Sequence, residues 1–500
     1  MRLINLKLLL ALLAGIVCTF GFAPFGYYLL HVLALAALVV LVMKADKPRC
    51  AGKLGFMFGL GMFSVGTGWI YVALHDYGGM PLLLAATATL LFSAFLSLFA
   101  ALGCYFQARL AVAAWQRATL LWPATWVVAE WVRGTIFTGF PWLNAGYAHS
   151  DSALAGYAPL FGVYGISLVA AVSAGLLALL FVERTADRLK QALFFLMLLW
   201  LGGAMLREVK WTRPAGDPFS VALIQGNIPQ NLKFNEDAMV GTLETYRRLA
   251  LESNAQLTVL PETAIPLLRN EIPPNLIEQL RNHARSNGGD LVFGAFERNN
   301  GESYNSVFTL GSADEQRYRK HHLVIFGEFI PLRPLMGWFI NDVLDIPMGD
   351  LGRGGIAQPT LQVAGQQVAP DICYEDVFGE EIIGHLPQAT ILLNLTNDAW
   401  YGDSYAADQH NQISRMRALE SGRMMLRATN TGVTSVIASD GKILQQLPQH
   451  QEAVLRGNAQ GYAGATPYVV WGNTAAMLII ALMLGYLWAL RQSPDSHVNK

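Results

Sequence analysis

Charged residues are scarce in this chain. Only 14% of its 500 residues are Asp, Glu, Lys or Arg, whereas 53% are hydrophobic, and a soluble globular protein carries about 25% charged residues. Lys and Arg number 35 and Asp and Glu 36, so the net charge is −1. This balance argues against a nucleic-acid partner, which requires a basic surface. The composition therefore excludes an ordinary soluble enzyme and indicates that much of the chain lies in a membrane.

Cysteine is also scarce. The four residues form no CxxC pair and no zinc-ligand spacing, which excludes a disulfide scaffold. Cys18, Cys50 and Cys104 fall in or beside apolar runs, and Cys373 stands alone far downstream. His321 and His322 are adjacent, but no third ligand follows at a convincing spacing. We therefore expect neither a metal nor a cofactor.

Long runs without charge predict about eight transmembrane helices, since one span needs about 20 apolar residues. The first run is long enough for two spans, and Gly21, Pro24 and Gly26 divide it. A cleaved signal peptide is the alternative for its first half, but the immediate continuation favours a retained anchor. The runs are 8–43, 54–74, 80–107, 118–129, 152–182, 191–206 and 457–490.

Lys and Arg are distributed unequally among the loops. They occur in 44–53, 109–117 and 184–190, and they are absent from 75–79 and 134–159. Because cytoplasmic loops are enriched in Lys and Arg, this pattern predicts a multi-pass membrane protein whose basic loops are cytoplasmic. In a bacterial cell, the membrane would be the inner membrane and the opposite side would be the periplasm. Residues 1–207 would hold helices 1–7, residues 208–456 a periplasmic domain, and residues 457–500 helix 8 and a cytoplasmic tail.

The segment 208–456 has the composition of a soluble domain, and strand-like and helix-like patterns alternate along it, which predicts a layered α/β fold. We expect a hairpin around Asp440-Gly441 and a strand pair over 361–372 that turns at Gly365. The other expected strands are 219–224, 257–260, 291–296, 306–310 and 390–395. The expected helices are 239–253, 274–286, 375–384 and 409–426.

Three residues of this domain follow strand-like segments and could meet at one sheet edge. Glu262, partly buried, would suit general base catalysis; alternatively it is a helix N-cap partner or a surface residue. Lys320 could stabilise an oxyanion or could belong to a basic loop that faces lipid or water. Cys373, at a strand end before an expected helix, would have a lowered pKa; alternatively it is a small buried hydrophobe. Together the three would suit covalent acyl transfer through a thioester.

The residues around these candidates resemble a known family. Pro261-Glu262, Lys320 and Cys373-Tyr374-Glu375 are similar to the Glu-Lys-Cys set of the nitrilase, or carbon–nitrogen hydrolase, superfamily. With the membrane spans, the chain resembles the bacterial apolipoprotein N-acyltransferases over nearly its whole length. The matching motifs are 137–142, 225–230, 260–266, 322–324, 326–329, 394–400 and 415–423. The resemblance implies an α-β-β-α sandwich on the periplasmic side, joined to an α-helical membrane domain.

The resemblance also implies a two-step reaction. Cys373 would take an acyl chain from a phospholipid, typically phosphatidylethanolamine, and pass it to the N-terminal α-amino group of a diacylglyceryl-cysteine apolipoprotein. Glu262 would be the base, and Lys320 would stabilise the tetrahedral intermediates. Glu328, Tyr374 and Glu375 match positions important for activity in the family. Phe234 stands where the family often has Trp; it keeps the apolar contact and loses the indole donor. A monomer is expected.

Two other functions fit parts of the sequence. A membrane-tethered amidase of the nitrilase type would share the triad but would need only one anchor. A transporter or receptor with an inactive domain would place ionisable residues inside the spans, and few are there. Glu130 and Arg133, beside a Trp-rich run, either have a function or mark the water boundary. The apolar stretch 336–340 either dips into the bilayer surface or packs on its own domain.

Overall fold

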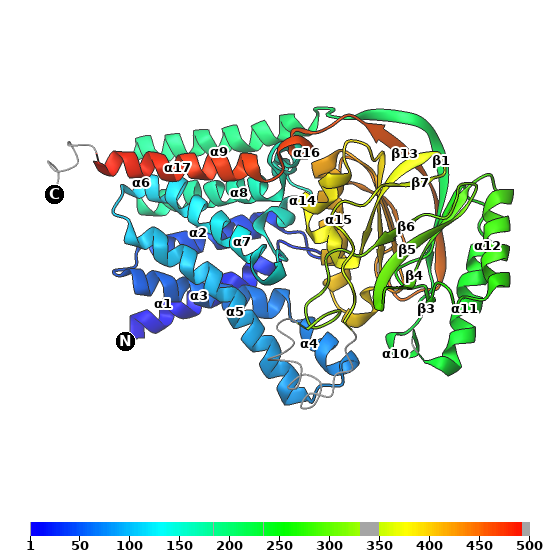
Figure 1. Ribbon diagram of the computed structural model, residues 1–500. Coiled ribbons are helices and arrows are strands. Elements are labelled where there is room, and N and C mark those ends of the chain that lie inside the picture. Colours follow the sequence, from blue (N-terminus) through cyan, green and yellow to red (C-terminus); the bar gives the residue numbers. More distant parts are fainter. Residues whose placement is uncertain (1, 184, 234, 331–349, 493–500) are drawn as a thin grey trace. The chain divides into compact units, whose positions relative to one another are not determined.

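The computed structural model describes residues 2–183, 185–233, 235–330 and 350–492, which divide into two compact units (Figure 1). The first, here called the helical unit, comprises Met1–Tyr71, Leu83–Val209 and Val470–Lys500. The second, here called the α/β domain, comprises Val72–Leu82 and Lys210–Val469. The expected boundary at residue 456 falls inside the last strand of the α/β domain, which continues to Ala463.

The helical unit contains long apolar helices. The principal helices are α1 (Arg2–Thr19), α2 (Tyr28–Met43), α3 (Pro48–Gly66), α5 (Leu82–Arg109), α7 (Trp122–Arg133), α8 (Ala158–Val182), α9 (Ala186–Arg207) and α17 (Thr474–Gln492). Among the described residues, four helical segments are long and apolar enough to cross a membrane, and α3 makes a fifth if it is joined to the helix beyond its 58° bend. The structure thus supports a membrane protein. The expected number of about eight spans stays a prediction, because α1 and α2 are shorter.

The surface of the helical unit is apolar where a soluble protein would be polar. Leu83 of α5 is 80% exposed, Met205 of α9 is 74% exposed and Leu482 of α17 is 65% exposed. Helix α8 is the most buried of the four long segments, and it packs against α2, α7, α9 and α17. A buried central helix surrounded by helices with apolar outer faces is the arrangement that a hydrocarbon environment favours.

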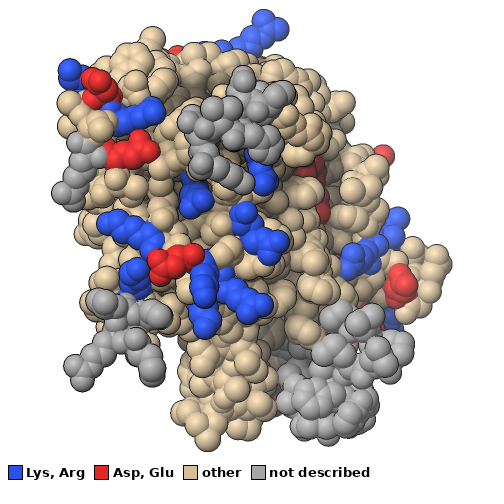
Figure 2. All heavy atoms as spheres, turned by 90° about the vertical axis from the view of Figure 1, so that its left-hand side faces the viewer, with Lys and Arg blue, Asp and Glu red and all other residues tan. Residues whose placement is uncertain are grey.

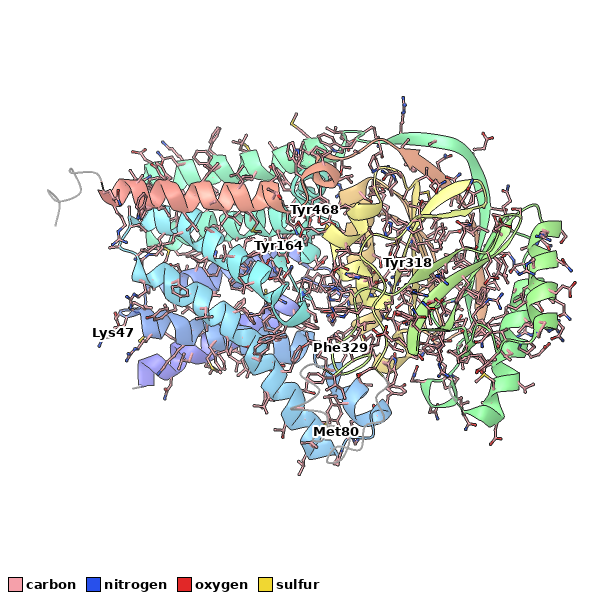
Figure 3. The ribbon with its side chains drawn as sticks, viewed as in Figure 1. Lys47, Met80, Tyr164, Tyr318, Phe329 and Tyr468 are labelled. Atoms are coloured by element: carbon pink, nitrogen blue, oxygen red, sulfur yellow. The ribbon has the colours of Figure 1, made fainter. Side chains whose placement is uncertain are left out.

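Basic residues gather at one end of the helical unit. This is the end where α1 begins, where the α2–α3, α5–α7 and α8–α9 connections lie, and where α17 ends (Figure 1). Viewed from this end, Lys and Arg outnumber Asp and Glu (Figure 2), and Lys47 lies here (Figure 3). The helix directions therefore bring the basic loops recognised in the sequence to a common end.

Glu130 and Arg133, on α7, organise the polypeptide that follows this helix. Arg133 donates hydrogen bonds to the carbonyl oxygens of Phe140 and Trp142 and to Asn144 Oδ1, 2.7 Å away. Glu130 Oε1 accepts from Trp126 Nε1 at 3.0 Å and from the backbone N–H of Ala145 at 2.9 Å. Both residues are buried. They hold the motif 137–142 in place and do not mark a water boundary.

The α/β domain contains two β-sheets. The first has the strand order β13-β1-β2-β4-β5-β6, with β3 paired to β4, and the second has the order β12-β11-β10-β9-β8-β7. The strands of the first sheet are β1 (Arg213–Gln225), β2 (Leu257–Val259), β3 (Ile265–Leu268), β4 (Asp290–Asn299), β5 (Glu302–Gly311), β6 (Arg317–Arg319) and β13 (Ala453–Ala463). Those of the second are β7 (Leu361–Val363), β8 (Gln366–Ile372), β9 (Ile391–Thr396), β10 (Met425–Thr429), β11 (Ser435–Ile437) and β12 (Ile443–Gln446).

Three hydrophobic cores separate four layers. Alternate residues of β4 divide between two of them: Val292 faces the core between the sheets, whereas Leu291 and Phe293 face the core beneath α11 (Glu236–Leu251) and α12 (Pro274–Ser286). A third core lies between the second sheet and the layer of α14 (Gly379–Ile382) and α15 (Ala406–Ser421). Figure 1 shows these helices on the outer faces. The expected α-β-β-α sandwich is the architecture found.

Two expected helices of the domain are wrong in extent. The helix expected over 409–426 ends at Ser421, because Gly422 adopts a left-handed conformation (φ 63°) that terminates it, and Met425 and Leu426 begin β10. The helix expected over 375–384 is divided into a short turn, Cys373–Val377, followed by α14. Strands β3, β6, β10 and β13 were not expected from the sequence.

Candidate active site

Glu262 and Lys320 lie together in the interior of the α/β domain. Glu262 follows β2 and Lys320 follows β6. Lys320 Nζ lies 3.4 Å from Glu262 Oε1 and 2.9 Å from Glu328 Oε1. Asn305 Nδ2 donates to Glu262 Oε1 at 2.7 Å. The structure therefore brings two expected catalytic residues and Glu328 into direct contact, and it adds Asn305, which sequence reasoning missed.

Cys373 follows β8 and begins the turn Cys373–Val377 with a left-handed backbone conformation (φ 56°). Such a conformation is uncommon for a residue with a side chain and costs about 1 kcal/mol. Two side chains hold its carbonyl oxygen: Asn394 Nδ2 donates at 3.1 Å, and His410 Nε2 lies 3.3 Å away. The surrounding structure therefore fixes the strained turn that presents the thiol.

The pKa of the Cys373 thiol is raised. Burial is the main cause, and the negative charge of Glu262 acts in the same direction, whereas the ammonium of Lys320 acts to lower it. The expected lowering of the Cys373 pKa by a helix N-terminus is wrong, because burial dominates; the segment that begins at Cys373 is a five-residue turn. A thiol of this kind stays protonated until a base removes the proton, and the two charged side chains that affect it most are Glu262 and Lys320.

Glu375 connects the segment of Lys320 to that of Cys373. Its carboxylate accepts hydrogen bonds from the backbone N–H groups of His321 at 2.6 Å, His322 at 3.0 Å and Ile372 at 2.7 Å. Tyr318, labelled in Figure 3, donates its hydroxyl to the same carboxylate at 3.1 Å. Burial raises the pKa of Glu375 to about 7. The residue thus acts as an acceptor that fixes two catalytic segments.

Beneath the Cys373 turn lies a buried ion network that sequence reasoning missed. His410 Nε2 lies 2.9 Å from Asp376 Oδ1, and His410 Nδ1 lies 2.8 Å from Asp398 Oδ1. Arg427 pairs with the same two carboxylates at 3.2 and 3.0 Å. Burial and Arg427 act to lower the pKa of His410, but the two carboxylates outweigh them and raise it to about 9. Two cations therefore balance two anions in the interior.

Comparison with known proteins assigns this arrangement to a family. A family model described as Apolipoprotein N-acyltransferase N-terminal domain matches residues 14–176, and one described as Carbon-nitrogen hydrolase matches residues 220–468. A curated apolipoprotein N-acyltransferase of Nitrosomonas europaea is 48% identical over 487 residues, covering 96% of this chain and 96% of the relative. The chain belongs to the apolipoprotein N-acyltransferase family. It is an acyltransferase, as the resemblance implied.

Two further relatives in the apolipoprotein N-acyltransferase family also match nearly the whole chain. The relative from Ralstonia nicotianae is 46% identical over 488 residues, covering 94% of this chain and 90% of the relative. The relative from Methylococcus capsulatus is 42% identical over 499 residues, covering 99% and 98%. The similarity therefore extends through the helical unit and the α/β domain alike.

The remaining expected site residues lie around this centre. Tyr374 is buried beside Phe378, with ring centroids 5.4 Å apart. His321 Nδ1 lies 2.7 Å from the Gly354 carbonyl, and His322 Nδ1 lies 2.8 Å from Glu381, so their rings face different groups. Phe234, which replaces the Trp common in the apolipoprotein N-acyltransferase family, and the apolar stretch 336–340 lie outside the described residues.

A second buried lysine also borders the site. Lys233, at the end of α10 (Gln230–Lys233), donates from Nζ to the backbone carbonyl of Glu262 at 3.0 Å. Its side chain is buried. Sequence reasoning missed Lys233, although it follows the 225–230 motif of the apolipoprotein N-acyltransferase family by three residues. A lysine in a short polar helix gives no sign of burial.

Proposed function

We propose that this chain transfers a fatty acyl chain from a phospholipid, typically phosphatidylethanolamine, to the N-terminal α-amino group of a diacylglyceryl-cysteine apolipoprotein. A thioester on Cys373 carries the acyl group between the two substrates. The observation that carries the proposal is the buried contact between Lys320 and Glu262, in a chain that belongs to the apolipoprotein N-acyltransferase family. All these residues come from one chain, so a monomer is sufficient.

The first half-reaction loads the enzyme. Glu262 takes the proton from Cys373 Sγ, and the thiolate attacks the ester carbonyl carbon of the phospholipid. The Lys320 ammonium stabilises the negative charge that develops on the carbonyl oxygen. When the tetrahedral intermediate collapses, the bond to the glycerol oxygen breaks, and the lysophospholipid leaves with the proton that Glu262 held.

The second half-reaction transfers the acyl group from Cys373 to the acceptor. The neutral α-amino group attacks the thioester carbonyl, Glu262 takes a proton from the attacking nitrogen, and the carbon–sulfur bond breaks. The Cys373 thiolate leaves and recovers the proton from Glu262. A thioester retains the free energy of acyl transfer, so neither half-reaction requires ATP, and ping-pong kinetics follow.

The proposed topology places the α/β domain at the periplasmic face of the inner membrane. The basic end of the helical unit is then cytoplasmic, in agreement with the distribution of Lys and Arg (Figure 2). Helix α9 begins at that end and α17 returns to it, so the chain leaves for the α/β domain from the other end. Eight spans follow if α1, α2 and α7 also cross the bilayer.

The experiment is the intact mass of the purified full chain after incubation with phosphatidylethanolamine vesicles. We expect one added acyl chain on Cys373, removable by neutral hydroxylamine. A diacylglyceryl-cysteine peptide with a free amine should then discharge the adduct and gain one acyl chain. The matched control peptide, with its α-amino group acetylated, should leave the adduct intact.

Two results would contradict the proposal. An adduct that maps to Cys18, Cys50 or Cys104 would assign the chemistry to another thiol. Release of free fatty acid with no acylated peptide would instead indicate a hydrolase that passes the acyl chain to water. A Cys373→Ser variant, which keeps the shape of the site, serves as the negative control for loading.

A further inference from the structure

The charges around Lys320 do not balance within the expected triad. Lys320 is the cation of two ion pairs, with Glu262 at 3.4 Å and with Glu328 at 2.9 Å. One ammonium and two carboxylates leave these three side chains with one excess negative charge while Cys373 is a neutral thiol, and the nearby Glu375, which also interacts with Lys320, supplies no positive charge. Forming a thiolate beside an uncompensated negative charge is unfavourable. A further cation near Glu262 would remove this obstacle.

The 225–233 segment supplies such a cation. Asn430, at the end of β10, donates from its side chain to the Ile228 carbonyl at 2.7 Å, and the backbone N–H groups of Asn227 and Ile228 donate back to Asn430 at 2.9 Å each. Gln230 Oε1 accepts from Asn397 Nδ2 at 2.8 Å. These bonds fix the start of α10, and Lys233 at its end reaches the Glu262 carbonyl.

Within the described part of the chain, the Lys233 ammonium has few hydrogen-bond acceptors around it and lies near the ionisable groups of the site. An ammonium has three N–H donors, and among the described residues the Glu262 carbonyl is its only hydrogen-bond acceptor. Burial lowers the pKa of Lys233 to about 8, while the charges of Glu262 and Cys373 act to raise it. The ionisable groups that face this ammonium most closely are therefore the expected base and the expected nucleophile.

We propose that Lys233 is a second, positioning cation of the active site, whose charge stabilises the Cys373 thiolate during acyl transfer. With Lys233 charged, the cluster of two lysines and two carboxylates is neutral. The proton then moves from Cys373 to Glu262 at constant net charge, as the S–H bond breaks and an O–H bond forms. This inference rests on the proposed role of Cys373 as the nucleophile.

The test is the rate at which neutral iodoacetamide alkylates Cys373 in the purified full chain, followed by peptide mass mapping. Lys233→Gln keeps an N–H donor for the Glu262 carbonyl but removes the charge, and Lys233→Arg keeps the charge. We expect alkylation at pH 7 to slow about ten-fold or more in the Gln variant and to stay within about three-fold in the Arg variant. Lys442→Gln, at an exposed ion pair with Asp440, should match the wild type.

The pH profile separates a charge effect from a structural one. In the wild type, Lys233 loses its proton as the pH passes about 8, so the rise of the alkylation rate with pH should flatten there. In Lys233→Arg the rate should keep rising. The comparison of the wild-type and Lys233→Arg profiles tests the charge effect of Lys233 even if Lys233→Gln does not fold. Coincident wild-type and Arg profiles, or normal alkylation in a folded Gln variant, would overturn the proposal.

The two proposals fail differently. If Lys233 has no electrostatic role, Cys373 still forms the acyl adduct with phosphatidylethanolamine, and alkylation does not depend on residue 233. If Cys373 is not the acyl carrier, the adduct is absent, whereas the alkylation rates still follow the charge at residue 233.

Discussion

Lys320 Nζ lies 2.9 Å from the Glu328 carboxylate, and this contact is shorter than the one between Lys320 and the expected base. Glu328 also accepts from the backbone N–H of Val324 at 2.9 Å. Glu328 is thereby tied to the segment that follows Lys320, and it holds the ammonium in one place. An oxyanion-stabilising cation must be fixed before the charge develops, since the benefit comes from preorganisation.

Glu328→Gln should consequently slow acyl loading of Cys373. The amide keeps the size of the side chain but loses the charge that fixes Lys320, and we expect a decrease on the order of 10². The measurement is the time course of hydroxylamine-sensitive acyl-Cys373. Glu302→Gln, which changes an exposed carboxylate in β5, is the matched control. Loading of Glu328→Gln at the wild-type rate would show that Lys320 needs no such partner.

Gly294 of β4 should tolerate no side chain. A Cβ at this position would lie 2.4 Å from Thr263 N and 2.8 Å from Pro261 O, so Gly294→Ala must displace the backbone that carries Glu262. Because a shift of about 1 Å in a catalytic group costs about 10² in rate, loading should fall by that order. Gly241→Ala is the control. No atom within 4 Å would meet its Cβ, and alanine stabilises the α11 helix by up to about 1 kcal/mol.

Glu375→Gln should impair catalysis more than Tyr318→Phe. The Glu375 carboxylate accepts from three backbone N–H groups, and an amide NH₂ cannot accept from them. Tyr318→Phe removes only one donor to the same carboxylate. We expect a loading rate reduced on the order of 10² for Glu375→Gln and by less than about ten-fold for Tyr318→Phe, since an unsatisfied buried group costs about 1–3 kcal/mol. Equal effects would contradict the role of Glu375 as a backbone acceptor.

His410 should make the stability of the α/β domain pH-dependent. Its folded-state pKa of about 9 exceeds the ordinary value of about 6.5, so the folded state binds this proton more tightly than the unfolded state. The stabilisation is fully present below pH 6.5 and is lost as the pH rises through 9. The temperature at the midpoint of thermal unfolding should therefore decrease as the pH rises from 6.5 to 9, and the decrease should be smaller in His410→Asn. His450→Asn, at an exposed site, should keep the wild-type dependence.

Reporter fusions test the topology. Fusions after Lys47 and after Lys190, both in the basic connections of the helical unit, should report the cytoplasm. A fusion at Gly288, an exposed glycine that follows α12, should report the periplasm. A cytoplasmic signal at Gly288, or a periplasmic one at Lys47, would reverse the proposed orientation.

The layered fold was predictable because alternation is a local signal. Helix α12 has the bounds expected from the sequence, Pro274–Ser286. The expected turn at Gly365 joins β7 to β8, and Gly365 has a positive φ of 72°. The errors come where a tertiary requirement overrides the local pattern. Met425 and Leu426 continue an apolar helical pattern, but Leu426 packs in the core between the sheets.

The candidate site was predictable where chemistry depends on residue type, and less so where it depends on burial. Glu262, Lys320 and Cys373 are conspicuous because they follow strands. Asn305 and Lys233 are ordinary polar residues in the sequence, and they matter only because folding removes water from them. The pKa of Cys373 was expected in the wrong direction for the same reason, since the desolvation of a thiol cannot be read from its neighbours along the chain.

Strands β1 and β13 pair antiparallel from Arg213↔Ala463 to Gln225↔Ala453. The two ends of the longer segment of the α/β domain, Lys210–Val469, are therefore adjacent, with paired Cα atoms about 5 Å apart. This segment is closed upon itself, because its first and last strands pair with each other. A short linker from residue 463 to residue 213 would circularise it without crossing its core, and new termini could then be opened at an exposed glycine such as Gly288.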